Sequence, residues 1–124
     1  MAAFRRFEEI LAWQKARQST KLIYEETLKG DFSRDFDLRG QIRRSSISIS
    51  ANIAEGFGRK SDKEFAQFLS IALASAYETQ SHLYLALDLG YISQDRFARL
   101  YASLDEICRM TFGLRQSVLN TKQS

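Results

Sequence analysis

The sequence predicts an all-α fold, an up-down-up-down bundle of four helices in a single domain that spans residues 1–124. Three observations carry this prediction. The chain has no proline and only 6 glycines, so few of its residues break a helix. Apolar residues recur at intervals of three and four over long stretches. The breaks between these stretches are short, which favours antiparallel neighbours that cross at shallow angles.

The first two helices are expected at about residues 7–29 and 36–57. The apolar stripe of the first comprises Phe7, Ile10, Leu11, Trp13, Tyr24 and Leu28. Gly30 is expected to end that helix in a left-handed conformation. The stripe of the second comprises Leu38, Ile42, Ser46, Ile49, Ile53 and Phe57. Residues 46–50 also alternate with period two, as strands do, but the longer three-four pattern favours a helix.

The last two helices are expected at about residues 62–89 and 94–119. Ser61 and Glu64 have the spacing of a capping box, Gly90 should end the third helix, and Ser93 can cap the fourth. The third stripe comprises Phe65, Leu69, Ala72, Ala76, Thr79, Leu83 and Leu87. The fourth comprises Phe97, Leu100, Leu104, Ile107, Thr111, Leu114 and Val118.

The net charge of +3 is unevenly distributed. Residues 1–63 hold 13 lysines and arginines against 9 acidic residues, whereas residues 64–124 hold 5 against 6. This asymmetry permits a polyanionic partner without requiring one. Cys108 is the only cysteine, so an internal disulfide is excluded and a reducing cytoplasm is favoured. No apolar run approaches the roughly 20 residues of a membrane span, and we expect a cytoplasmic protein without a membrane partner.

The sequence predicts no catalytic residues, no metal site and no cofactor. His82 is the only histidine and is expected on the flank of its helix, while Cys108 is expected in the core as a small hydrophobic residue. One histidine and one cysteine on different helices give no zinc spacing. Glu78 precedes His82 by four residues, whereas a di-iron bundle needs a separation of three. We therefore expect a protein that is not an enzyme.

The second helix carries small residues on nearly every side, which lets another backbone approach closely. That backbone could belong to the same bundle or to another subunit. We favour the subunit, because Ile47 lies opposite Ile49 and one core cannot bury both sides. The predicted subunit interface comprises Ile47, Ala51, Asn52, Ala54, Glu55, Tyr77 and Tyr84. Asn52 and Glu55 are expected to hydrogen-bond across a helix contact, and the tyrosines have base stacking as an alternative role.

Basic residues bracket the second helix and the turn after it. They are Arg39, Arg43, Arg44, Arg59, Lys60 and Lys63. Arg39 and Arg43 are one helical turn apart, so both can reach one phosphate backbone. The alternative is a solvated charged surface. Repetition of a modest basic patch in an oligomer would strengthen its field.

The second helix also carries a resemblance to a known family. QIRR at residues 41–44, followed by SISANIAEG at residues 48–56, resembles the signature of the 23S rRNA-intervening sequence proteins. The flanking segments LAWQKA (11–16), SDKEF (61–65) and LGY (89–91) are similar to that family too. Two departures are Ser50, where the family commonly has proline, and Ala74-Ser75, where it has Gly-Ser.

The resemblance implies a bacterial four-helix bundle that assembles into a homopentameric ring and whose biochemical role is poorly defined. A related branch, the accessory variability determinants of diversity-generating retroelements, works with a reverse transcriptase and binds nucleic acid. We therefore expect a non-enzymatic homo-oligomeric scaffold that binds RNA or DNA as an accessory factor. A protein-protein assembly module, which would dock another protein and bind no nucleic acid, remains the alternative.

Overall fold

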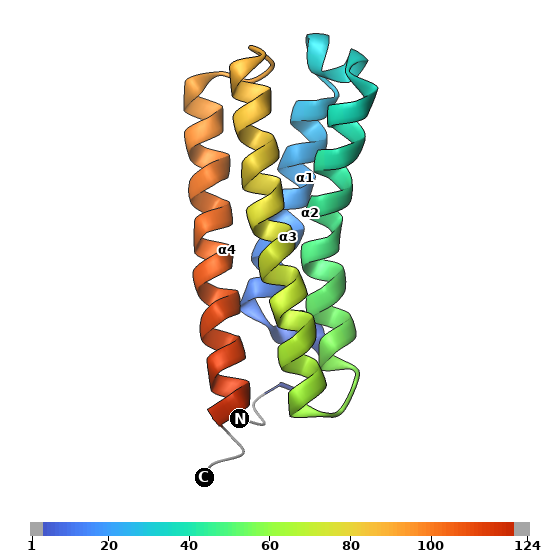
Figure 1. The fold of residues 1–124 in the computed structure, drawn as a ribbon, viewed down its shortest axis with the longest axis vertical. Coiled ribbons are helices and arrows are strands. Elements are labelled where there is room, and N and C mark those ends of the chain that lie inside the picture. Colours follow the sequence, from blue (N-terminus) through green and yellow to red (C-terminus); the bar gives the residue numbers. More distant parts are fainter. Residues whose placement is uncertain (1–3, 121–124) are drawn as a thin grey trace.

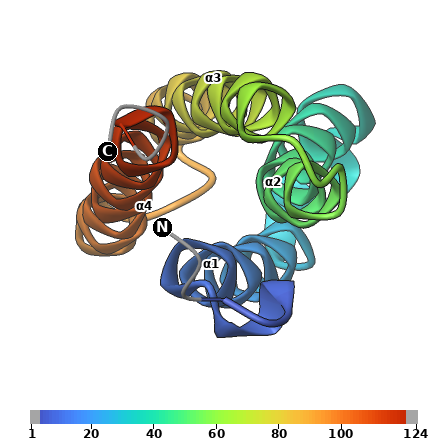
Figure 2. The ribbon, with the colours of Figure 1, turned by 90° about the horizontal axis from the view of Figure 1, so that it is seen from below.

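The computed structural model describes residues 4–120 and confirms the predicted bundle. Its helices are α1 (Leu11–Thr27), α2 (Phe36–Phe57), α3 (Asp62–Asp88) and α4 (Gln94–Asn120), and the described residues form no strand. Figure 1 shows that consecutive helices run antiparallel. Seen along the bundle in Figure 2, α1 and α3 each stand between α2 and α4. Within residues 4–120 no helix is both long and apolar enough to cross a membrane.

The first predicted helix is wrong at both ends. A short 3₁₀ turn, η1 (Phe7–Glu9), is followed by Ile10 in an extended conformation, and α1 starts only at the next residue. The extended backbone directs the Ile10 side chain into the core, where it is 1% exposed. At the other end α1 stops at Thr27, and a second 3₁₀ turn, η2 (Gly30–Arg34), leads to α2. Gly30 has the predicted positive φ of 46°, but it lies beyond the helix end.

The buried face of α1 also differs from its predicted stripe. Leu11 and Leu28 are 63% and 67% exposed. The buried residues of the helix are mostly small or polar, namely Ala12, Ala16, Ser19, Ile23, Glu26 and Thr27. Small side chains let α1 approach its neighbours closely. The predicted stripe was wrong for this helix because it was built from large apolar residues, whereas the buried side carries mostly small or polar ones.

The other predicted stripes are largely confirmed. All of their members are buried except Phe57, Leu87 and Leu114, which are partly buried. The predicted serine caps form, because Ser61 Oγ accepts from the Glu64 amide and Ser93 Oγ accepts from the Arg96 amide, whereas only the serine half of the capping box is present in the described residues. After α3, Gly90 adopts a φ of 76°. The amides of Gly90 and Tyr91 then bond back to Leu87 and Ala86, which closes a Schellman motif.

The small residues of α2 serve contacts inside the chain. Ser48 and Ser45 bond to Ser75 and Thr79 of α3 at 2.9 and 2.8 Å. Gly56 lies against α3 so closely that an added Cβ would stand 2.6 Å from the Cβ of Phe68. The dense run of serines and glycine is therefore explained in part by tight packing of α2 on α3. This is the alternative in which the approaching backbone belongs to the same bundle.

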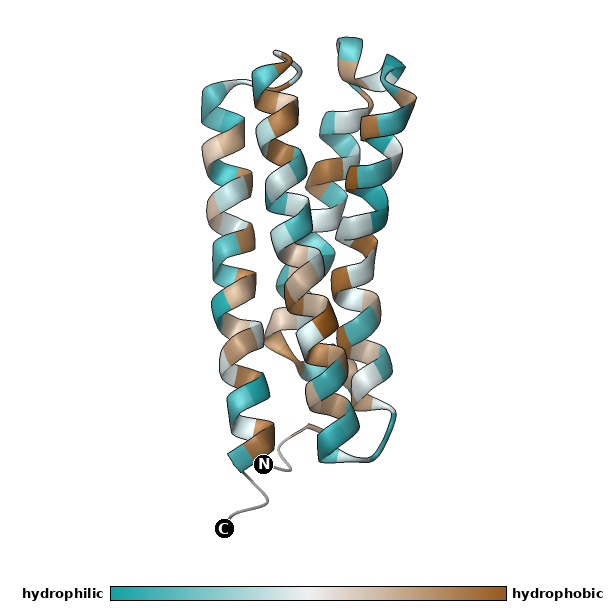
Figure 3. Cartoon of the chain, in the orientation of Figure 1, coloured by the Kyte–Doolittle hydropathy of each residue, from teal (hydrophilic) through white to brown (hydrophobic). Residues whose placement is uncertain are grey.

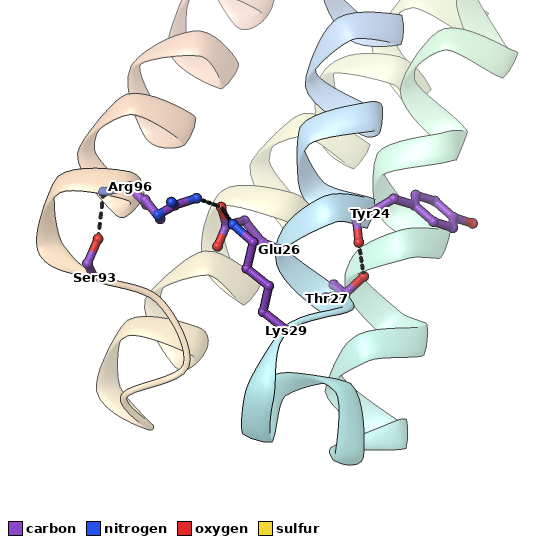
Figure 4. A network of polar contacts seen from close by, with 6 residues as sticks. All are labelled: Tyr24, Glu26, Thr27, Lys29, Ser93 and Arg96. Carbon is purple, nitrogen blue, oxygen red and sulfur yellow. Dashed lines mark hydrogen bonds and ion pairs between the residues drawn. The ribbon is translucent and has the colours of Figure 1, made fainter.

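The contact between α1 and α4 is fastened by ion pairs. Figure 4 shows Glu26 of α1 held between Arg96 of α4 and Lys29, with Lys29 Nζ 3.3 Å from the carboxylate. Lys15 and Glu106 form a second bridge between these helices at 3.0 Å. In Figure 3 hydrophilic and hydrophobic segments alternate along every helix, as expected for a bundle with a polar exterior.

Candidate nucleic-acid interface

The structure divides the six predicted basic residues into two separate groups. Arg39, Arg43 and Arg44 lie in the first half of α2, whereas Arg59, Lys60 and Lys63 lie at and beyond its other end. The 20 residues from Arg39 to Arg59 correspond to roughly 30 Å along the helix. One continuous patch made of all six residues is therefore excluded within a single chain.

Arg39 and Arg43 are held in place by contacts around the start of α2. Arg43 Nε donates to Thr27 Oγ1 at 2.9 Å, and its guanidinium lies 4.4 Å from the centre of the Tyr24 ring. Arg39 Nη1 donates to the Ser33 carbonyl at 2.7 Å, and its guanidinium lies 4.7 Å from the centre of the Phe36 ring. These contacts fix where both charges stand while leaving their remaining N–H groups for a ligand.

Helix α1 adds basic and aromatic residues that the sequence argument did not identify. The guanidinium of Arg17 lies 5.7 Å from the centre of the Trp13 ring. Thr20 bonds to Ser46 of α2, which places residues 13, 17, 20 and 24 along the α2 side of α1. Trp13, Arg17 and Lys21 also line an open hollow of about 510 Å³. The spacing of four between Trp13 and Arg17 was a signal that could have identified them.

These residues of the first two helices form one surface, which we call the α1/α2 face. It comprises Trp13, Arg17, Lys21, Tyr24, Phe36, Arg39 and Arg43, with Arg44 at its edge. Three of its five cations, namely Arg17, Arg39 and Arg43, lie over aromatic rings. Such an arrangement presents positive charge beside π surfaces, the two groups that contact phosphates and bases.

The cations of the α1/α2 face lack acidic partners. Among residues 4–120, no carboxylate lies within 4.0 Å of Arg17, Lys21, Arg39, Arg43 or Arg44. Of the acidic residues of α2, Glu55 pairs with Arg59 at 3.0 Å, and Asp37 lines one hollow with Phe36 and another with His82 of α3. The cations of this face therefore form no ion pair in the part of the chain that the structure describes, although Glu8 lines the same hollow as Arg17 and Lys21.

The arginines of α4 have the opposite environment. Arg96, Arg99 and Arg109 each face a carboxylate within 4.0 Å. Arg115 instead donates to Ser70 Oγ at 2.7 Å. Because three of these four charges are neutralised locally, α4 offers a polyanion much less than the α1/α2 face does.

The predicted subunit interface is distributed over several surfaces. Ile47 and Ala51 are exposed on the outer side of α2, with Ile47 44% exposed. Asn52 and Glu55 bond locally, Asn52 to Ser48 of α2 and Glu55 to Arg59 just beyond the end of α2. In the single chain these two residues do not bond across a helix contact. Ala54 is partly buried.

The two tyrosines of the predicted interface lie beside α4. The Tyr84 ring packs on Phe97 and Tyr101 at 4.9 and 5.5 Å between centroids. Tyr77, two helical turns earlier, is 56% exposed. Phe112 of α4 is 52% exposed and was not identified from the sequence. We call Tyr77, Tyr84, Phe97, Tyr101 and Phe112 the α3/α4 face.

The titratable residues considered for chemistry are largely enclosed. Cys108 is buried, and burial raises the pKa of its thiol to about 11, so the thiolate is scarce near neutral pH. His82 lies on the flank of α3 with Nε2 3.4 Å from Glu78, and its Nδ1 is buried without a partner. Within residues 4–120, no three histidine, cysteine or acidic side chains stand close enough together to hold a metal ion.

The bundle is similar to known proteins in both structure and sequence. The chain is similar to a solved structure from Bacteroides thetaiotaomicron, described as a protein of unknown function from the S23 ribosomal protein family. The two share 27% sequence identity and a TM-score of 0.77, over 85% of this chain and 98% of that one. No curated protein matches the chain. A family model described as 23S rRNA-intervening sequence protein matches residues 8–113, and the chain belongs to this family.

Proposed function

We propose that this protein is a non-enzymatic homo-oligomeric scaffold that binds RNA or DNA through its α1/α2 face as an accessory factor. The observation that supports this role is that, among residues 4–120, no carboxylate lies within 4.0 Å of the five cations of Arg17, Lys21, Arg39, Arg43 and Arg44. Uncompensated cations attract phosphates and release their counterions on binding. Thr27 holds Arg43 and Ser33 holds Arg39, so both guanidinium groups are oriented before a phosphate binds.

One copy of the α1/α2 face offers only a few phosphate contacts, so it binds weakly at physiological salt. Repetition of the face in a homo-oligomer joins several weak contacts to one nucleic-acid chain. Each bound face raises the effective concentration of the next, and the overall affinity then exceeds that of a single face. The role therefore combines a charged surface with assembly, and the family resemblance makes a pentameric ring the expected form of that assembly.

Two variants of equal net charge test the proposed function. Arg17→Gln/Lys21→Gln removes two unpaired cations from the α1/α2 face, and Arg99→Gln/Arg109→Gln removes two paired cations from α4. Binding to fluorescently labelled RNA and DNA is measured by anisotropy at low salt. The first variant should weaken binding about tenfold or more, while the second should change it little. Equal losses would show that only net charge matters and would overturn the assignment to this face.

A protein-protein assembly module is the second candidate, and the exposed apolar surface of α3 favours it. Leu85 is 49% exposed, Leu89 is 57% exposed and Tyr77 is 56% exposed. Exposed apolar groups on this scale are typical of contact surfaces when they adjoin one another. This candidate predicts a partner that co-purifies in a salt-insensitive manner, together with no nucleic-acid binding even at low salt.

A further inference from the structure

The hollow beside Trp13 has the chemical groups that a nucleotide requires. Its volume is about 510 Å³, and its lining comprises Glu8, Trp13, Gln14, Arg17, Gln18 and Lys21. The indole offers a flat surface for stacking. Arg17 and Lys21 offer charge for a phosphate, and glutamine amides can read the edges of a base because they both donate and accept. Trp13 is the one apolar side chain of this lining, and Glu8 is its one acidic residue.

Local contacts orient two of these groups. The Phe7 ring meets the Trp13 ring edge-on at 5.0 Å between centroids, which supports the indole from the η1 side. Gln14 Nε2 donates to the Glu8 carbonyl at 2.8 Å. That bond fixes the Gln14 amide and leaves its carbonyl oxygen and second N–H for a ligand. Trp13 and Gln14 are therefore held in place before a ligand arrives.

Resting on the proposed function, we propose that this hollow receives an unpaired nucleobase, so that the α1/α2 face prefers single-stranded RNA or DNA to a duplex. Arg17 lies over the indole in the free protein and moves to the adjoining phosphate when a base takes its place. An exposed cation-π contact is weak, and a base with a charge-assisted phosphate contact replaces it. Both faces of a base inside a duplex are covered by its neighbours, so only an unpaired or flipped base can stack on Trp13.

Trp13 is itself the probe for this inference, because it is the only tryptophan of the chain. Intrinsic fluorescence is titrated with a single-stranded oligonucleotide of about a dozen nucleotides, with its duplex and with an abasic strand of equal charge. RNA and DNA versions of each are compared, and anisotropy follows binding in parallel. We expect strong quenching by the single strands, and little by the duplex or by the abasic strand. Bound single strands that leave the emission unchanged would overturn the inference alone, whereas no binding by anisotropy would overturn the proposed function itself.

A pair of aromatic variants gives a second readout. Trp13→Leu should weaken binding of the single strand by roughly 5- to 100-fold and leave duplex binding unchanged. Phe112→Leu, which removes an exposed aromatic from the α3/α4 face, should change neither. Equal weakening of single-strand and duplex binding by Trp13→Leu would contradict the stacking assignment. The quenching experiment needs no variant, so it stands even if Trp13→Leu disturbs the contact with Phe7.

Discussion

The α1/α2 face and the α3/α4 face lie on opposite sides of one bundle. The side chains of each face make different kinds of contact. On the α1/α2 face, Arg43 bonds to Thr27 and lies over Tyr24, and in the described part of the chain its neighbouring cations form no ion pair. On the α3/α4 face, Tyr84 packs on Phe97 and Tyr101, and Arg99 and Arg109 of α4 each face a carboxylate of the same helix. The difference separates two roles of aromatic residues, since on one face they support cations and on the other they close a helix contact.

The largest expected effect comes from breaking the aromatic contact of the α3/α4 face. Tyr84→Ala removes a ring that packs on two others, so the free energy of unfolding should fall by about 2 kcal/mol. Nucleic-acid binding should stay unchanged because the α1/α2 face is untouched. Urea denaturation and anisotropy measure the two quantities. A variant with normal stability but weaker binding would show that the α3/α4 face binds nucleic acid and does not stabilise the bundle.

The next largest effect should separate the two groups of predicted basic residues. Arg39→Gln/Arg44→Gln removes unpaired charges, and we expect about a tenfold loss of affinity for labelled RNA or DNA. Arg59→Gln/Lys63→Gln removes the same charge at the other end of α2, where Glu55 already pairs with Arg59. This second variant should lose only about two- to threefold. If the two losses are reversed in size, the turn between α2 and α3 is the binding surface.

Arg43 should show a mixed effect, because it belongs to both the fold and the proposed interface. Arg43→Gln removes the bond to Thr27 and the contact with Tyr24, at an expected cost of about 1 kcal/mol in unfolding free energy. Affinity for nucleic acid should fall by about threefold. Lys21→Gln is the matched control, since Lys21 is exposed and forms no ion pair within residues 4–120. Its loss should weaken binding without lowering stability. A fully stable Arg43→Gln variant would show that these contacts are dispensable.

The smallest effect concerns the end of the bundle, where one contact joins α2 to the loop between α3 and α4. The Leu38 amide and the Tyr91 hydroxyl, which donates at 2.8 Å, hold the pKa of Asp35 below its ordinary value of 3.8. The folded pKa is the lower one, so this stabilisation is present above the ordinary pKa and is lost as pH falls through the lowered pKa. As pH falls below about 4, the wild type should therefore lose more stability than Asp35→Asn. Parallel losses in urea titrations would contradict this contribution.

The four-helix fold could be predicted from the sequence because periodicity and end signals act locally. Ser61, Gly90 and Ser93 mark helix ends by their own chemistry, and the stripes of α2, α3 and α4 repeat over many turns. Ile10 could not be placed in the same way. Its extended backbone is favoured by burial of one side chain in the assembled core, and that gain is not visible in a local pattern.

The candidate site was predicted only in part, because its charge balance depends on tertiary contacts. Arg39, Arg43 and Arg44 were identified, but Arg59 was included although it pairs with Glu55, four residues earlier, a local pair that the spacing could have indicated. Arg17 and Lys21 were missed because tertiary contacts decide which cation an acidic residue pairs with. Glu26, for example, is directed to Arg96 on α4 (Figure 4). Unpaired charge becomes visible only when all neighbouring helices are in place.

The salt dependence of affinity shows whether the α1/α2 face binds phosphates. Affinity of the wild-type protein for labelled single-stranded and double-stranded RNA and DNA is measured by anisotropy over a range of salt concentrations. We predict a linear fall of log affinity with log salt whose slope shrinks by about two for Arg17→Gln/Lys21→Gln, one for each phosphate contact removed. No binding at low salt, or a slope that this variant leaves unchanged, would contradict phosphate binding by the α1/α2 face.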